Sequence, residues 1–169
     1  MLDSPHNRNA LSSRLLDELA EGLAEATADN TVRVVVLTAS GSVFCSRADL
    51  SAAGRVVTSQ MPDILTAIRA APMPIVARVG GHARAGGIGL IAACDLALAT
   101  RDSTFAFSEV RVGVAATKAL LGEMSELTWS EGLERAGARS VELFAGDDAA
   151  DGMDAFLHKR TPSWEVTIP

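Results

Sequence analysis

The sequence predicts an α/β fold in which short buried strands alternate with helices. Residues 31–37 and 74–79 are continuous apolar, largely β-branched runs, which are typical of strands covered on both faces in a parallel sheet. Leucines recur every fourth residue between positions 11 and 23, and from Gly86 aliphatic residues recur at helical spacing among glycines and alanines. This alternation predicts layers of sheet and helix, with functional loops at the strand ends.

Local signals place the other elements in chain order. Ser12 or Ser13 is expected to cap the leucine-rich helix, which ends near residue 30. The small and polar residues 51–60 predict a loop, and a short helix follows over residues 63–70. We expect two further strands and then three helices, at residues 95–100, 104–107, 117–127, 131–144 (behind Ser130) and 149–160.

A glycine cluster marks the most informative turn of the chain. The stretch HARAGGIGL lies between a predicted strand and the helix that begins near Gly86 or Gly87. The first backbone amides of a helix have no intrahelical acceptor, and glycines allow a ligand to come close to the backbone. The turn is therefore suited to bind a phosphate, a carboxylate or a carbonyl oxygen that becomes negative during a reaction. Equally, these glycines fit a helix that simply packs tightly against a sheet. The turn at Ser46, after another strand, supplies a second candidate amide.

Composition excludes several classes of function. With 169 residues, of which 48% are hydrophobic, the chain can bury one core. A net charge of -6 and a pI near 5.0 argue against nucleic-acid or membrane partners. Cys45 and Cys94 form no C-x-x-C motif and have no histidine cluster nearby, so neither a disulfide framework nor a metal site is indicated. Without a signal-peptide pattern or a transmembrane run, we expect a cytoplasmic protein.

Three stretches in the same order resemble successive motifs of the crotonase superfamily, the enoyl-CoA hydratases and isomerases: VFCSRADL, ARAGGIGLIAACDLALA and TFAFSEVRVGVA. The resemblance implies a crotonase-like layered (ββα)-type core over residues 1–115 and a C-terminal helical region over residues 116–169. Compared with the family, the chain lacks the first strand and an internal segment near Ala115–Ala116. Arg47 also stands where the family usually has a small residue.

The resemblance also implies a reaction and its residues. Family members hold a thioester oxygen with two backbone amides while enolate-like charge develops, which assigns the N–H groups of Ser46 and Gly86 to this role. Of the two hydratase glutamates, only Glu109 is present, because Gly89 occupies the other position. A single carboxylate suffices to move a proton between carbons, as an isomerase does, and hydration is still possible if it also orients water. No cofactor is implied, since CoA is part of the substrate.

Five further residues are candidates for substrate binding. Each has an ordinary structural alternative: a carboxylate that caps backbone amides, an exposed arginine, a packing glycine, a core phenylalanine and a solvated lysine. They are Asp49, Arg84, Gly87, Phe156 and Lys159. Asp95 is more typical of a capping residue than of a substrate ligand. The family also implies a homotrimer or homohexamer, in keeping with the apolar content of the C-terminal helices.

These observations favour an enoyl-CoA hydratase-like enzyme acting on an acyl-CoA thioester. An enoyl-CoA isomerase with Glu109 as its single acid and base is the close alternative. A catalytically silent CoA-binding protein also fits, because of Gly89, Arg47 and the absent segment. Dinucleotide binding is a weaker hypothesis: residues 87–92 fit G-x-G-x-x-A, but a loop separates them from the strand that ends at Val79.

Overall fold

The computed structural model describes residues 1–47, 54–107, 119–124 and 126–163, with the backbone alone at 54–59 and 156–157. The chain forms two compact units, Met1–Ser108 and Glu109–Pro169. The boundary predicted after residue 115 lies outside the described residues.

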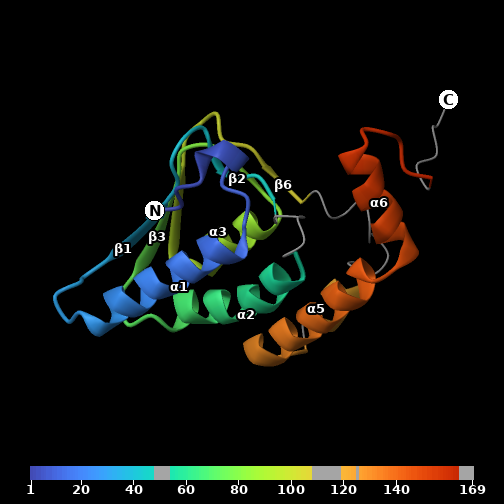
Figure 1. The fold of residues 1–169 in the computed structure, drawn as a ribbon. Coiled ribbons are helices and arrows are strands. Elements are labelled where there is room, and N and C mark those ends of the chain that lie inside the picture. Colours follow the sequence, from blue (N-terminus) through green and yellow to red (C-terminus); the bar gives the residue numbers. More distant parts are fainter. Residues whose placement is uncertain (48–53, 108–118, 125, 164–169) are drawn as a thin grey trace. The chain divides into compact units, whose positions relative to one another are not determined.

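The first unit repeats the order strand, strand, helix. The first strand of each repeat joins one parallel sheet, in the order β1-β3-β5, and the second joins another, in the order β2-β4-β6 (Figure 1). This is the layered (ββα) arrangement expected from the sequence. The elements are β1 (Val35–Thr38), β2 (Val43–Cys45), α2 (Gly54–Ala70), β3 (Ile75–Val79), β4 (His82–Arg84), α3 (Gly86–Ala93), β5 (Leu96–Ala99) and β6 (Phe105–Ala106).

Helix α1 (Ser13–Ala28) follows a short 3-10 turn, Pro5–Asn7, and lies beside α2 (Figure 1). The Ser12 hydroxyl accepts a hydrogen bond from the Leu15 N–H at 3.2 Å, which confirms the predicted cap. The buried side chains of α1, α2, α3 and strands β1 to β4 form one apolar cluster, which includes Leu15, Leu16, Phe44, Ile64, Ile68, Ile75, Ala83 and Leu90. This cluster is the core that holds the end of β2 and the start of α3.

The prediction that residues 31–37 form a strand covered on both faces was wrong in two respects. Strand β1 begins only at Val35, because the Asp29 carboxylate accepts hydrogen bonds from the Thr31 N–H and hydroxyl and so closes a turn. Within the described part of the first unit, its sheet is covered on one face: Leu37 is buried, whereas Val36 and Leu98 are 50% and 66% exposed. Leu37 belongs to the apolar cluster that includes side chains of α1 and α2, whereas Val36 and Leu98 do not.

Helix α2 and strand β4 differ from what the sequence predicted. Helix α2 begins at Gly54, so the loop predicted over residues 51–60 was wrong from that residue on. Gln60 Nε2 donates to the Asp17 carboxylate of α1 at 2.6 Å, and this tertiary contact stabilises helix where local propensity is weak. The sequence interpretation also missed the short strand β4. Just before it, the backbone at Gly81 lies so close to that of Ser42 that a Cβ on Gly81 would be 2.1 Å from the Ser42 carbonyl oxygen.

The second unit is helical, as predicted. Residues 119–124 are helical and are followed by α5 (Trp129–Phe144) and α6 (Asp147–Leu157). The predicted cap at Ser130 was wrong, because Thr128 caps α5 in a capping box: its N–H donates to Glu131 Oε2 at 2.8 Å. In the described part of the chain, no helix has the length and apolar character needed to cross a membrane.

Candidate active site

The start of α3 leaves the Gly86 N–H without an acceptor among the described residues. Ala85, the residue before the helix, has φ 52° and ψ −128°, an uncommon conformation for a residue with a Cβ. Its N–H donates to the Ala106 carbonyl at 3.2 Å, and its own carbonyl accepts from the Ile88 N–H at 2.9 Å. Among the described residues, nothing accepts a hydrogen bond from the Gly86 N–H. A free amide at a helix N-terminus is suited to bind a negative or developing negative oxygen.

The end of β2 lies directly against this helix start. Strand β2 pairs with β4 so that Cys45 is opposite Ala83. A Cβ built on Gly87 would lie 2.5 Å from the Cβ of Cys45 and 2.9 Å from its Sγ, so the helix reaches β2 only because residue 87 is glycine. The two sequence motifs are therefore brought together, since Ser46 follows Cys45 and Gly86 precedes Gly87.

The Ser46 amide, in contrast, already has an acceptor. Its N–H donates to the Arg8 carbonyl at 3.1 Å, and the Ser46 hydroxyl donates to the Asn7 carbonyl at 3.3 Å. The Leu11 N–H donates to the Arg47 carbonyl at 2.8 Å in the same stretch. A substrate oxygen at Ser46 would have to share or replace the Arg8 carbonyl, and the oxyanion role of Ser46 stays a prediction.

Arg84 is half-buried and its guanidinium is engaged within the protein. It donates to the Thr104 carbonyl at 2.7 Å, to the Thr104 hydroxyl at 2.8 Å and to the Ala83 carbonyl at 3.0 Å. The His82 ring nitrogen Nδ1 lies 3.0 Å from the same hydroxyl. Arg84 thus links β4 to the segment that leads into β6, and a contact with a phosphate would compete with these bonds.

The other predicted site residues are placed less completely. Glu109 and Asp49 lie outside the described residues, as does the side chain of Phe156 in α6. Lys159 is exposed just after α6, with a φ of 52°, in the second unit. The prediction for Asp95 is confirmed: its carboxylate accepts the Ile75 N–H at 2.7 Å and so joins β5 to the start of β3.

Metal and dinucleotide sites find little support in the geometry. Within the described ranges, no three His, Cys, Asp or Glu side chains gather closely enough to hold an ion. Gly87 and Gly89 lie inside α3, not in a phosphate-binding turn, and β4 occupies the stretch that the sequence predicted as a loop. The glycines expected to approach a pyrophosphate instead contact protein, with Gly87 against Cys45 and Gly89 beside Leu65.

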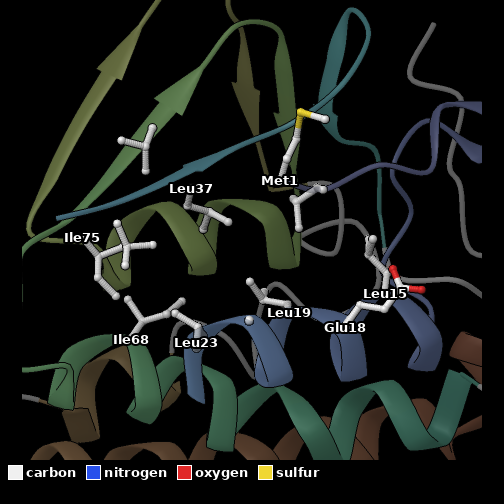
Figure 2. Close-up of a pocket in the computed structure, with 12 residues that line it drawn as sticks. Met1, Leu15, Glu18, Leu19, Leu23, Leu37, Ile68 and Ile75 are labelled. Atoms are coloured by element: carbon white, nitrogen blue, oxygen red, sulfur yellow. The ribbon is translucent and has the colours of Figure 1, made fainter. Parts of the chain in front are cut away.

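A separate apolar pocket lies between α1 and the β1-β3-β5 sheet (Figure 2). Figure 2 shows leucines of α1 facing the side chains of Leu37 and Ile75, with Glu18 the one ionisable side chain in the lining. Ligand sites usually combine an apolar wall with several convergent polar groups. This pocket has no such group of polar side chains and contains none of the residues predicted for the site.

Asn9 is a residue that the sequence interpretation missed. It is fully buried, with φ 54°, and its side chain makes three hydrogen bonds near the end of β2. The available signal was an asparagine in a turn-rich stretch, since asparagine adopts the left-handed conformation more readily than most residues.

The conformation of Ala85 yields a first prediction. Ala85→Gly removes the energetic penalty of a positive φ, which stabilises the folded state. It also removes a buried methyl group and makes the unfolded chain more flexible, and both of these changes are destabilising. We expect the first effect to be larger and the net stabilisation to be about 0.5–1 kcal/mol. Ala93 is similarly buried at the other end of α3, and Ala93→Gly should instead destabilise by about 1–1.5 kcal/mol. Urea denaturation of both variants measures the difference, and equal losses would contradict the proposed strain at Ala85.

The Cys94 thiol is expected to be unreactive at ordinary pH. Burial, together with the nearby charge of Asp95, raises the pKa of Cys94 to about 11. Since the thiolate is the reactive form and a raised pKa depletes it, iodoacetamide labelling should stay slow through pH 9 and accelerate only as the pH approaches 11. Mass spectrometry of the labelled peptide against pH tests this, and a labelling rate that levels off below pH 9 would contradict it.

The arrangement of two interleaved parallel sheets, with a free amide at a glycine-rich helix start, is that of a crotonase-type protein. Residues 1–126 match the enoyl-CoA hydratase/isomerase family, and the chain belongs to this family. It is similar to the probable enoyl-CoA hydratase echA6 of Mycobacterium bovis, with 35% identity over 152 residues, or 88% of this chain and 61% of the relative. It is also 32% identical to the human enoyl-CoA hydratase domain-containing protein 3, mitochondrial, over 94% of this chain and 52% of the relative.

A solved structure supports the same assignment. An enoyl-CoA hydratase from Mycobacterium avium matches with a TM-score of 0.72 and 30% identity, over 96% of this chain and 91% of that one. The crotonase-like α/β fold predicted from the sequence is therefore confirmed. The chain nevertheless spans only about half to six-tenths of the length of these two curated relatives.

Proposed function

We propose that this protein is an enoyl-CoA hydratase-like enzyme that binds an acyl-CoA thioester through the start of α3. The observation that carries the proposal is the free Gly86 N–H at this helix start, packed against the end of β2. When a proton is removed beside a thioester, negative charge develops on the carbonyl oxygen. A preorganised amide at that oxygen stabilises the charge, and the Ser46 N–H supplies the second donor once the Arg8 carbonyl gives way.

Proton transfer is assigned to Glu109. A family hydratase divides the positioning of water between two carboxylates, whereas this chain has Gly89 at the other position. With one carboxylate, Glu109 takes a proton from one carbon and returns it to another in an isomerase, or orients water and returns the proton in a hydratase. A silent CoA-binding protein is the second candidate, favoured by the engaged Ser46 amide and by Gly89.

One experiment separates these three functions. The protein is incubated with a panel of enoyl-CoA thioesters of different chain length and double-bond position in deuterated water, and the products are separated by liquid chromatography, which resolves double-bond isomers, before mass spectrometry. A hydratase adds the mass of deuterated water, and an isomerase moves the double bond without adding water. A silent binder shows affinity for the thioesters with neither a change of mass nor a new isomer, and the absence of both binding and turnover would contradict the proposal.

We also propose that the protein assembles into trimers or pairs of trimers in the cytoplasm. Support comes from the second unit, where Val141 and Phe144 on α5 are 61% and 40% exposed. Exposed apolar side chains on a helix are typical of surfaces covered by another chain. Light scattering at micromolar concentration tests the assembly, and a monomer would contradict it.

A further inference from the structure

Asn9 connects the N-terminal loop to the turn that leads into β2. Its side-chain oxygen accepts the Ser4 N–H at 2.7 Å, while its side-chain nitrogen donates to the Ser40 carbonyl at 2.9 Å and the Val43 carbonyl at 2.7 Å. Among the described residues, it is the one polar residue that is buried, at 0% exposed. A buried amide with three partners of good geometry holds the segments that it joins in a fixed relation.

The loop that Asn9 fixes is the one that contacts Ser46. Arg8 precedes Asn9, and its carbonyl accepts the Ser46 N–H at 3.1 Å. Both Arg8 and Asn9 have positive φ, at 59° and 54°, a pairing that persists only where surrounding contacts enforce it. The Arg8 and Asn9 N–H groups donate to the Pro5 and Ser4 carbonyls within the loop. The hydrogen bonds of the Asn9 side chain add the connection between this loop and the start of β2.

We propose that Asn9 is a positioning residue of the candidate oxyanion site. It does not touch the reacting atoms. Through the Ser40 and Val43 carbonyls it sets the course of β2, and through Arg8 it sets the hydrogen bond that orients the Ser46 N–H while no substrate oxygen is present. Its consequence for catalysis rests on the proposed function, whereas its effect on the Ser46 amide does not.

Hydrogen exchange of single amides tests the positioning role directly. Asn9→Gly keeps the backbone free to adopt a positive φ and removes all three side-chain hydrogen bonds. We expect the Ser46 amide to exchange about tenfold faster or more in this variant, because local opening now releases it, while the Ile75 amide, held by Asp95, changes less than about twofold. Asn7→Ala is the matched control, since it removes only the local bond to the Ala10 N–H.

A second variant and a kinetic readout complete the test. Asn9→Asp tolerates the positive φ and keeps the acceptor for Ser4, but it loses both donors, so it should reproduce the selective exchange at Ser46. With an enoyl-CoA that the enzyme turns over, kcat should fall about tenfold in either variant while KM stays within about twofold, as expected for an interaction realised in the transition state.

The outcomes separate the two proposals. Equal acceleration at Ser46 and Ile75, no acceleration at Ser46, or unfolding of both variants would overturn the positioning role. A wild-type protein without activity on any enoyl-CoA would contradict the proposed function, while the exchange data would still decide whether Asn9 positions Ser46.

Discussion

Replacing Gly87 with alanine is expected to destabilise the fold by about 3 kcal/mol, because the new methyl group has no space. It would lie 2.5 Å from the Cβ of Cys45, an atom that no side-chain rotation can move. Helix α3 must therefore shift away from β2, which loosens the contact between the two candidate oxyanion motifs. Urea denaturation at 25 °C measures the loss as a lower midpoint.

Gly89 provides the matched control on the same helix. A Cβ at this position meets only the ends of the Leu65 and Met61 side chains, at 3.9–4.0 Å, which is ordinary contact distance. Alanine is a better helix former than glycine, so Gly89→Ala should stabilise the protein by about 0.5–1 kcal/mol. Equal effects at the two positions would show that α3 does not pack against Cys45 as described.

Glu109→Gln is expected to lower kcat by about a hundredfold or more if Glu109 is the acid and base of the proposed reaction. Glutamine keeps the shape of the side chain and removes its capacity to take a proton. The affinity for CoA and the free energy of unfolding should hardly change, because a glutamate near a strand end contributes little to the core. Steady-state kinetics with a turned-over enoyl-CoA provide the test, and an active enzyme indifferent to this change would contradict the role of Glu109.

Gly89→Glu tests the other half of that account by restoring a carboxylate at the position where the family's second glutamate is absent. A Cβ at Gly89 would lie at ordinary contact distance from the Leu65 and Met61 side chains, so α3 has room for the start of a side chain there. Hydration should increase if the absent carboxylate limits it, and the double-bond isomerisation should not increase in proportion. A variant that folds, binds the thioester and shows no gain in hydration would argue against a limitation at this position.

The sequence predicted the elements whose signal is local. The leucine period of α1 with its serine cap, the apolar run of β3 and the start of α3 at Gly86 all match the structure. The family motifs also led to the correct fold, because they recur in the order in which the (ββα) repeats follow one another.

The misses concern contacts between segments distant in sequence. No local pattern reveals that Gln60 bonds to Asp17, so the first turns of α2 were interpreted as loop. The exposed face of the β1-β3-β5 sheet was missed for a related reason. An apolar run indicates that both faces of a strand are suited to burial, but it does not indicate whether other segments of the chain pack against both faces.

The candidate site was predicted in position but not in detail. The resemblance placed Ser46 and Gly86 together, and the packing of Gly87 on Cys45 agrees with this. That Arg8 bonds to the Ser46 amide, and that Arg84 bonds to Thr104, depends on loop conformations with no sequence signature. Only the three-dimensional arrangement shows which donors are free to meet a ligand.

The central claim, that the start of α3 binds the oxygen of a thioester, is tested most directly by amide NMR with two matched ligands. Acetyl-CoA carries the thioester carbonyl, whereas S-ethyl-CoA has the same nucleotide and thiol arm but lacks that oxygen. We predict that acetyl-CoA shifts the Gly86 N–H resonance downfield, as a new hydrogen bond does, and that S-ethyl-CoA leaves it near its free position. The same shift with both ligands, or none with acetyl-CoA at saturation, would contradict the assignment of Gly86.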